Sequence, residues 1–212
     1  GEKGGNYDAV ARALADYLQK AEGWEVKIRE SSGSGANLKL LRTGEVDLCL
    51  VQNDFPGDEK ARALASLFDE SLHVIVREGN TSLSNFPGGT ISVGQAGGGT
   101  EALARAMLAQ LGVSQKSVNW RHESLQAGLD GLRSGKSTAV CVVTGIGNAV
   151  VAEALSKGDL SLLSLGEVPG ASLAYDYPFV ETTTIPPKVY ATAPGKGLPA
   201  RSLSTVGTRV VL

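Results

Sequence analysis

The feature that most constrains the fold is a glycine turn between a strand and a helix. Residues 90–93 form the apolar run Thr-Ile-Ser-Val, and a helical pattern begins at Ala102. Between them lies Gln95-Ala96-Gly97-Gly98-Gly99-Thr100-Glu101. Three glycines permit positive φ and the close approach of a guest molecule, while Thr100 and Glu101 suit a helix start. Such a start offers unpaired N–H groups and partial positive charge, so it can bind a carboxylate or phosphate, although a plain strand-to-helix turn explains the same pattern.

This arrangement occurs twice in the chain. An Ala-Arg-Ala core follows a glycine pair at residues 11–13 and again at residues 104–106. Arg-Thr-Gly at 42–44 and Arg-Ser-Gly at 133–135 each lead into an apolar run that contains a cysteine. The two matches have nearly the same offset and the same order. They predict two related α/β lobes whose glycine-opened helices face one cleft.

Hydrophobic periodicity predicts an alternation of helices and strands. The alternation over 90–165 favours a mostly parallel sheet covered on both faces. Residues 77–87 are polar and mark a boundary, so we expect lobe one to comprise 1–77 and 200–212, and lobe two to comprise 78–199 with the returning hinge segment. The segment 166–174 is rich in turn residues. We expect helices at 7–20, around 38–41, and at 100–111, 125–133 and 149–156, and strands at 24–30, 46–51, 72–76, 90–93, 118–121, 139–143, 160–165 and 206–212.

Charge and composition indicate a small guest. The 20 basic and 22 acidic residues leave a net charge of −2, and no basic block is present, so we expect no nucleic-acid partner. No apolar stretch is long enough to span a bilayer, and we expect no direct membrane insertion of this segment. The two cysteines fall in different lobes and are expected to be free thiols. Two isolated histidines give no cluster for a metal, and we expect no metal and no cofactor.

Several collinear motifs resemble one family, the TAXI class of extracytoplasmic solute-binding proteins that serve tripartite (TRAP) transporters. Gly4-Gly5-Asn6-Tyr7 is similar to the family's Gly-Gly-Thr-Tyr loop, and Val51-Gln52-Asn53-Asp54 is similar to its Val-Gln-Ser-Asp. Gly44-Glu45-Val46-Asp47-Leu48 resembles its Gly-Glu-x-Asp-Leu segment. The resemblance covers essentially the whole chain. Further counterparts are the block from Ser92 to Glu101, Thr144-Gly145, and the segment from Tyr177 to Tyr190.

The resemblance implies a two-lobed clamp of the type II periplasmic-binding-protein kind, each lobe a mixed, mostly parallel sheet flanked by helices. Such a clamp would capture a small organic acid, with a glutamate-like amino acid or a dicarboxylate as the expected class. It would deliver this acid to the membrane subunits of a TRAP transporter, in a periplasmic or other extracytoplasmic location. The second-lobe motif at Thr144 is close to the family pattern but not identical to it.

The expected ligand site lies between the lobes. The turn from Gly98 to Thr100 would hold a carboxylate on backbone N–H groups, while Tyr7 and Gln52 would approach from the other lobe with a serine. Glu101 could hold an amino group of the guest, but stabilising the helix start explains it as well. The full set of expected ligand-binding residues is Gly5, Asn6, Tyr7, Ser32, Ser34, Gln52, Gln95, Gly98, Gly99, Thr100, Glu101, Thr144, Gly145 and Tyr190.

Two other interpretations use the same residues. The clamp could be the ligand-sensing domain of a membrane-anchored receptor. It could instead be an enzyme, but the sequence has no Gly-x-Ser-x-Gly elbow, no histidine near a candidate nucleophile and no paired acids spaced on one face. We therefore expect no enzyme and no catalytic residue. His73 lies in an apolar run and is expected in the core, and His122 is expected at the surface.

Overall fold

The computed structural model describes residues 1, 3–55, 59–82, 86–166, 177–193 and 196–212. An eight-stranded sheet has the order β1-β10-β2-β5-β3-β4, with β6 paired to β2 and β7 paired to β10. Its strands are β1 (Val51–Gln52), β2 (Ser66–Arg77), β3 (Thr90–Ser92), β4 (Asn119–Arg121), β5 (Ala139–Thr144), β6 (Leu160–Leu162), β7 (Glu181–Ile185) and β10 (Leu203–Val211). The other elements are the hairpin β8 (Tyr190–Ala193) with β9 (Lys196–Leu198), the helices α1 (Asn6–Glu22), α2 (Ser34–Arg42), α3 (Gly99–Gln110), α4 (Leu125–Arg133) and α5 (Ala149–Ser156), and a 3-10 turn at Gln115–Ser117.

The sheet is mixed, and the expected α/β class is confirmed. Strand β3 runs parallel to both β4 and β5. Strand β2 is antiparallel to β5, β6 and β10, and β10 is antiparallel to β1 and β7. The sheet is less parallel than predicted, because β2 is inserted as an antiparallel strand between β5 and β6. Strands β3, β4, β5 and β6 nevertheless run in the same direction, since β5 and β6 are both antiparallel to β2 and β3 is parallel to β4 and β5.

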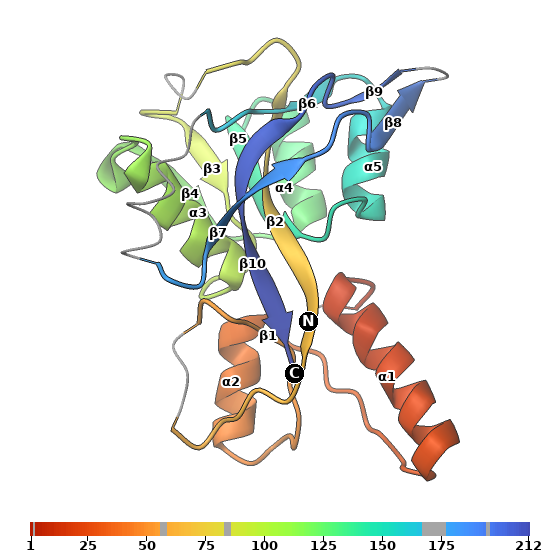
Figure 1. Cartoon of the computed structure of the whole chain (residues 1–212). Helices are drawn as coiled ribbons and strands as arrows, with labels where there is room; N and C mark the ends of the chain where they lie inside the picture. Colours follow the sequence, from red (N-terminus) through yellow and green to blue (C-terminus); the bar gives the residue numbers. More distant parts are fainter. Residues whose placement is uncertain (2, 56–58, 83–85, 167–176, 194–195) are drawn as a thin grey trace.

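Strands β2 and β10 form the spine of the molecule. Figure 1 shows them running side by side from the part that carries α3, α4 and α5 to the part that carries α1, α2 and β1. Residues 71–75 of β2 pair with β5, whereas residues 66–71 pair with β10. The spine therefore passes from one part to the other near Ser71 and its partner Gly207.

We call the part that carries α3, α4 and α5 the upper part, as it is drawn in Figure 1, and the part that carries α1, α2 and β1 the lower part. Two apolar clusters cover the two faces of the sheet in the upper part. Helix α3 buries Leu103, Met107 and Leu108 on one face, at the spacing of a helical stripe. On the other face, α4 and α5 bury Leu129 and Leu155 with neighbouring apolar residues. Fully burying each such side chain contributes about 1.5–3 kcal/mol. These clusters fix the upper elements that carry the start of α3 and the end of β5.

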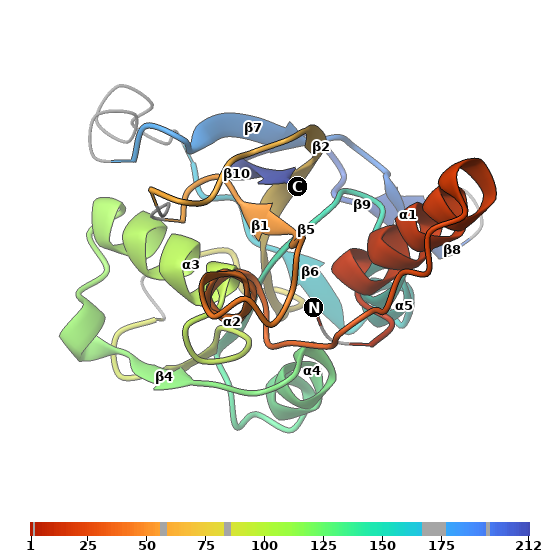
Figure 2. The ribbon, with the colours of Figure 1, turned by 90° about the horizontal axis from the view of Figure 1, so that it is seen from below.

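The lower part departs from the predictions. Residues 24–30 and 46–50 were expected in strands, but neither segment forms a ladder, and only the two residues of β1 pair with β10. Figure 2 shows the first segment as a coil between α1 and α2. Its alternating pattern suits a pleated surface, but a strand also needs a hydrogen-bonded neighbour, and the described residues supply none there. Trp24 is accordingly 57% exposed and Leu48 42% exposed.

Other expectations concern single features. Both cysteines are free thiols, Cys49 partly buried and Cys141 buried. The turn-rich segment 166–174 lies outside the described residues except for Gly166. None of the described helices has the length and apolar character needed to cross a membrane. Among the described residues, no group of histidine, cysteine, aspartate and glutamate is placed to hold a metal ion.

Candidate ligand site between the lobes

The glycine turns before α2 and α3 meet face to face. A Cβ atom added at Gly99 would overlap the carboxamide of Gln52, and one added at Gly35 would lie 2.7 Å from the carbonyl oxygen of Gly97. A Cβ at Gly98 would lie 3.6 Å from the carbonyl oxygen of Ser32. At Gly35 the obstructing atom is backbone of the other lobe, and at Gly99 it is the buried side chain of Gln52, so both positions favour glycine.

A second contact joins the start of α1 to the end of β5. The Nδ2 of Asn6 donates to Thr144 Oγ1 at 2.9 Å. The Nδ2 of Asn148 donates to Asn6 Oδ1 at 3.0 Å and to Thr144 Oγ1 at 3.1 Å. Asn148 Oδ1 also accepts from the backbone N–H groups of Val150 and Val151 and so caps α5. We call Asn6, Thr144 and Asn148 the amide latch.

Beneath the glycine turns lies a buried polar cluster formed by Tyr7, Ser34, Gln52 and Glu70. The hydroxyls of Tyr7 and Ser34 are 3.3 Å apart. Gln52 N donates to Ser34 Oγ at 3.1 Å, and Gln52 Nε2 donates to Glu70 Oε2 at 3.1 Å. The Oε1 atom of Gln52 is buried and has no partner among the described residues. Gln52 therefore faces the start of α3 with an unused acceptor.

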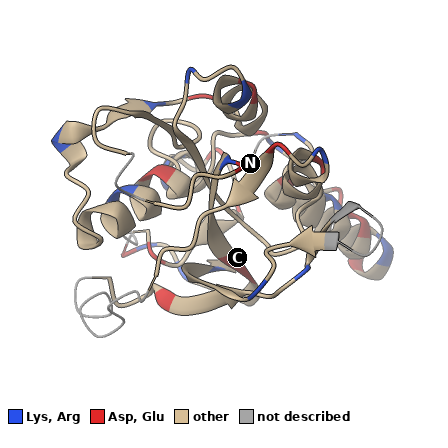
Figure 3. Cartoon of the chain, turned by 90° about the horizontal axis from the view of Figure 1, so that it is seen from above, with Lys and Arg blue, Asp and Glu red and all other residues tan. Residues whose placement is uncertain are grey.

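Burial raises the pKa of Glu70 to about 7, against the lowering effect of the bond from Gln52, and Asp54 adds to the rise. Burial also raises the pKa of Asp54 and of the Tyr7 phenol. In the described part of the chain, neither Glu70 nor Asp54 forms an ion pair with a basic side chain. The nearby Arg209 binds Asp69 at 2.8 Å instead. Figure 3 shows basic and acidic positions interspersed along the helices, loops and strands of the chain.

The start of α3 has no side-chain cap. Its first i to i−4 bond runs from Ala102 N to Gly98 O at 3.3 Å. The N–H groups of Gly99, Thr100 and Glu101 therefore have no acceptor within the helix, and none is found in the described residues. The helix has 12 residues, so its dipole adds partial positive charge at this end.

Residues 1–208 match the sequence profile of the NMT1-like family. The chain belongs to the NMT1-like family. Solved structures support the fold at low sequence identity. The substrate-binding protein of an amino acid ABC transporter is 15% identical, with a TM-score of 0.51 over 93% of this chain and 71% of that chain. An ancestral arginine-binding protein bound to arginine is 19% identical, with a TM-score of 0.52 over 72% of this chain and 67% of that chain.

The chain spans slightly less than two thirds of some relatives. A mutant of ArgBP from T. maritima is 18% identical, with a TM-score of 0.49 over 72% of this chain and 64% of that chain. The mixed sheet, the flanking helices and the meeting of two parts on a β2–β10 spine give this NMT1-like protein the fold of the type II periplasmic binding proteins.

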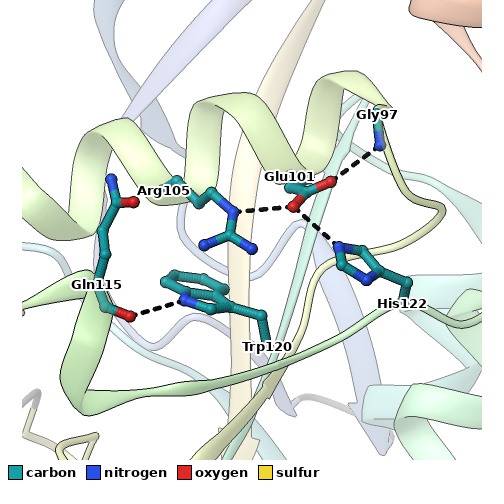
Figure 4. Close-up of polar contacts among 6 residues, drawn as sticks. All are labelled: Gly97, Glu101, Arg105, Gln115, Trp120 and His122. Atoms are coloured by element: carbon teal, nitrogen blue, oxygen red, sulfur yellow. Dashed lines mark hydrogen bonds and ion pairs between the residues drawn. The ribbon is translucent and has the colours of Figure 1, made fainter.

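Glu101 of the NMT1-like chain braces the glycine turn. Figure 4 shows its carboxylate bound to Gly97 N at 2.9 Å, to Arg105 Nε at 2.8 Å and to His122 Nε2 at 2.8 Å. Burial opposes its ionisation, but these three partners outweigh burial and lower the pKa of Glu101 to about 2. The guanidinium of Arg105 lies 4.1 Å above the ring of Trp120, and the indole of Trp120 donates to the Gln115 carbonyl at 3.0 Å. Because its carboxylate already has these three partners, Glu101 stabilises the turn at the start of α3.

Thr100 and Tyr190 use their hydroxyls inside the fold. Thr100 Oγ1 accepts from Val143 N at 3.0 Å, which ties α3 to β5. The Tyr190 hydroxyl lies 2.7 Å from His73 Nε2 and accepts from Gly147 N at 3.1 Å. Tyr190 is fully buried away from the glycine turns, and His73 is buried as predicted, with its pKa lowered to about 4 by burial.

The remaining residues predicted to bind the ligand lie next to the glycine turns or the amide latch. Gly5 precedes α1 as its cap, Ser32 is exposed, and Gln95 is partly buried in the turn before α3. A Cβ at Gly145 would lie 3.3 Å from Asn6 Nδ2, so this glycine borders the amide latch. The structure thus brings Asn6, Gln52, Gly99 and Thr144 to one interface but places Tyr190 outside it.

Two residues at this interface were missed by sequence reasoning. Glu70 lies within β2, two residues before its apolar run 72–76, where a charged residue is ordinarily solvated. Asn148 precedes the helical run Ala149-Val150-Val151, which is a recognisable cap signal. The cap could have been predicted, but its bond to Asn6 joins residues 142 positions apart in the chain.

Two larger hollows lie elsewhere on the lower part. One, of about 1100 Å³, is lined by α1 and by residues 24–29 and 45–50. The other, of about 700 Å³, is lined by α2, residues 60–64 and the end of β10. Neither is lined by the start of α3. The candidate site is a closed contact between lobes rather than an open pocket.

Proposed function

We propose that this NMT1-like protein is an extracytoplasmic solute-binding protein that closes two lobes on a small organic acid. The observation that carries the proposal is the convergence of the uncapped start of α3 with the unpartnered Oε1 of Gln52. Bare helix N–H groups bind carboxylates, so the organic acid supplies the acceptor that these groups lack.

In this proposal, the lobes divide where the spine passes from one part to the other. The lower lobe contains α1, α2, β1 and the paired ends of β2 and β10, and the upper lobe contains α3 to α5 with the rest of the sheet. This division lies near Ser71 and Gly207, within the strands rather than at residues 77 and 200. A Cβ on Gly207 would lie 2.8 Å from the Glu70 carbonyl oxygen, so the spine is tightly packed at this point.

The bound acid stabilises the closed form because only that form presents both halves of the site. The N–H groups at Gly99 and Thr100 would hold the carboxylate from above, while Tyr7, Ser34 and Gln52 would contact the guest from below. The amide latch adds bonds that exist only after closure. A ligand shifts a two-state equilibrium by its differential affinity, and these contacts supply that difference.

The resemblance to the TAXI class supports the rest of the proposal. The guest would be a glutamate-like amino acid or a dicarboxylate, and the closed protein would deliver it to the membrane subunits of a TRAP transporter from the periplasm or another extracytoplasmic compartment. The fold relatives, which include the binding protein of an amino acid ABC transporter, are compatible with a transport role.

A ligand screen tests the proposal. Purified protein is titrated by calorimetry and by thermal shift with amino acids, monocarboxylates and dicarboxylates. A ligand at 100 times its dissociation constant adds roughly 2.7 kcal/mol of stability. At about 2–4 °C per kcal/mol for a chain of this size, we expect a rise of about 5–11 °C in Tm. A screen in which no carboxylate binds at millimolar concentration would remove the proposed function.

A further inference from the structure

The interface contains an acid without a matching base. Glu70 is 3% exposed, and its charged neighbour in the cluster is a second acid, Asp54. Its facing groups are the Tyr7 phenol from α1, the Ser34 hydroxyl from α2, the Gln52 amide from β1 and Thr208, its partner on β10. Within the described residues none of these is a cation. A buried carboxylate without a cation is unfavourable by several kcal/mol, so a positive charge brought by a guest would be strongly attracted.

The carboxamide of Gln52 spans the distance between this acid and the start of α3. Its Nε2 donor binds Glu70, and its Oε1 acceptor rests against Gly99 without a hydrogen bond. The side chain is 4% exposed. One small group with a donor at one end and an acceptor at the other therefore fits between Glu70 and the bare N–H groups of α3. The head group of an α-amino acid has the same pattern, with an ammonium donor beside a carboxylate acceptor.

We propose that the guest is an α-amino acid whose ammonium group binds Glu70 while its carboxylate binds the start of α3. The Gln52 carboxamide occupies this position in the closed structure and moves aside for the head group. This inference rests on the proposed function and selects between its two ligand classes. A dicarboxylate would direct its second negative charge at Glu70 and Asp54, where like charges repel.

Proton release follows from the same contact. A carboxyl group with a pKa of about 7 is about half protonated at neutral pH, and an adjacent ammonium favours its charged form. Amino acid binding at pH 7 should therefore release up to about half a proton. Asp54 and Tyr7 are the other titratable groups that face Glu70, and the raised pKa of Tyr7 keeps its phenol neutral at this pH.

Matched ligand pairs test the inference. L-glutamate is compared with glutarate, and L-norvaline with valerate, so that the members of each pair differ only in the ammonium group. We expect at least one amino acid to bind roughly tenfold or more tightly than its deaminated partner. Glu70→Gln keeps the shape and a hydrogen-bonding group but removes the charge, and it should abolish this preference. Asp69→Asn is the control, because that carboxylate is 73% exposed on the opposite face and binds Arg209.

The outcomes separate the two proposals. If deaminated acids bind as tightly as their amino acids, the ammonium site is wrong while the solute-binding function stands. If no member of any pair and no other carboxylate binds, both proposals fail. Calorimetry in two buffers of different ionisation enthalpy measures proton release by the wild-type protein, which keeps the test decisive even if Glu70→Gln does not fold. Absence of proton release during amino acid binding at every pH from about 5 to 8 would overturn the assignment of Glu70.

Discussion

The packing of Gly99 against Gln52 gives the sharpest test of the closed interface. In Gly99→Ala, the added Cβ overlaps the Gln52 carboxamide, so the side chain must move and give up its bond to Glu70. Leaving a buried charged or polar group without its partner costs about 1–3 kcal/mol. This cost applies only when the lobes are closed, because Gly99 and Gln52 come from different lobes. In the liganded form, where the head group displaces the carboxamide, the added methyl group narrows the space into which the carboxamide can move and so crowds the bound guest. The substitution should therefore weaken ligand binding roughly 5- to 150-fold while the lobes stay folded.

Within α3 itself, the same substitution has a small and opposite effect. Alanine is favoured over glycine by roughly 0.5–1 kcal/mol in a helix interior, and by less at the first residue. The Tm of the ligand-free protein should accordingly change little, whereas the dissociation constant for an amino acid should rise. Calorimetry measures the affinity, and differential scanning fluorimetry of the same samples measures Tm.

A double-mutant cycle with Gln52→Ala identifies the obstructing group. Gln52→Ala removes the carboxamide, so Gly99→Ala should cost much less affinity in that background than in the wild type. The coupling between the two substitutions should exceed about 0.5 kcal/mol, as expected for residues in contact. Additive effects, or an unchanged affinity in Gly99→Ala, would refute the assignment of this contact to the closed, ligand-binding state.

Three further predictions follow from the same interface. Thr144→Val removes the hydroxyl that accepts from Asn6 and Asn148. Only the bond from Asn6 crosses between the lobes, and its loss, worth about 0.5–1.5 kcal/mol, should raise the dissociation constant about 2- to 12-fold with little change in the far-UV spectrum; an unchanged titration would contradict this. Glu101 has a lowered pKa of about 2, so its contribution is present above its ordinary pKa and is lost as pH falls from about 4.5 toward 2; acid unfolding of wild type should therefore lose more stability over this window than that of Glu101→Gln. Glu70 has a raised pKa, so the ligand-free protein should lose stability as pH rises from about 4.5 through 7, and urea titrations of Glu70→Gln should show a flatter profile across that range.

Hydrophobic periodicity was sufficient to predict most of the helices and the strand β5 of the upper lobe. The helices predicted at 125–133 and 149–156 are observed as α4 and α5 with the same bounds, and α3 is shifted by one residue from the predicted 100–111. Each of these helices buries a continuous stripe against the sheet, so periodicity and packing agree. The strand predicted at 139–143 likewise became β5, whose inward residues are buried in the sheet.

The same reasoning failed in the lower lobe because a strand is not a local structure. Trp24, Val26 and Ile28 alternate as strand residues do, but alternation alone supplies no hydrogen-bonded neighbour. The pairing of β6 shows the same limitation, because nothing within residues 160–162 specifies that β2 lies beside them. Sequence periodicity predicts which face of a segment is buried, whereas the partner strand depends on the whole topology.

Some residues of the candidate ligand site have a local sequence signal, and others become recognisable only in the folded chain. The glycine turn at Gly98 and the strand end at Gln52 each carry their own signal, and the structure brings them into contact. Glu70 carries no such signal, because it follows Asp69 just before an apolar run, where acids are usually solvated. Its importance arises only when α1, β1 and β10 enclose it and leave it without a cation. The net charge of −2 averages over such local imbalances, so the class of ligand has to be inferred from the charges that face the interface.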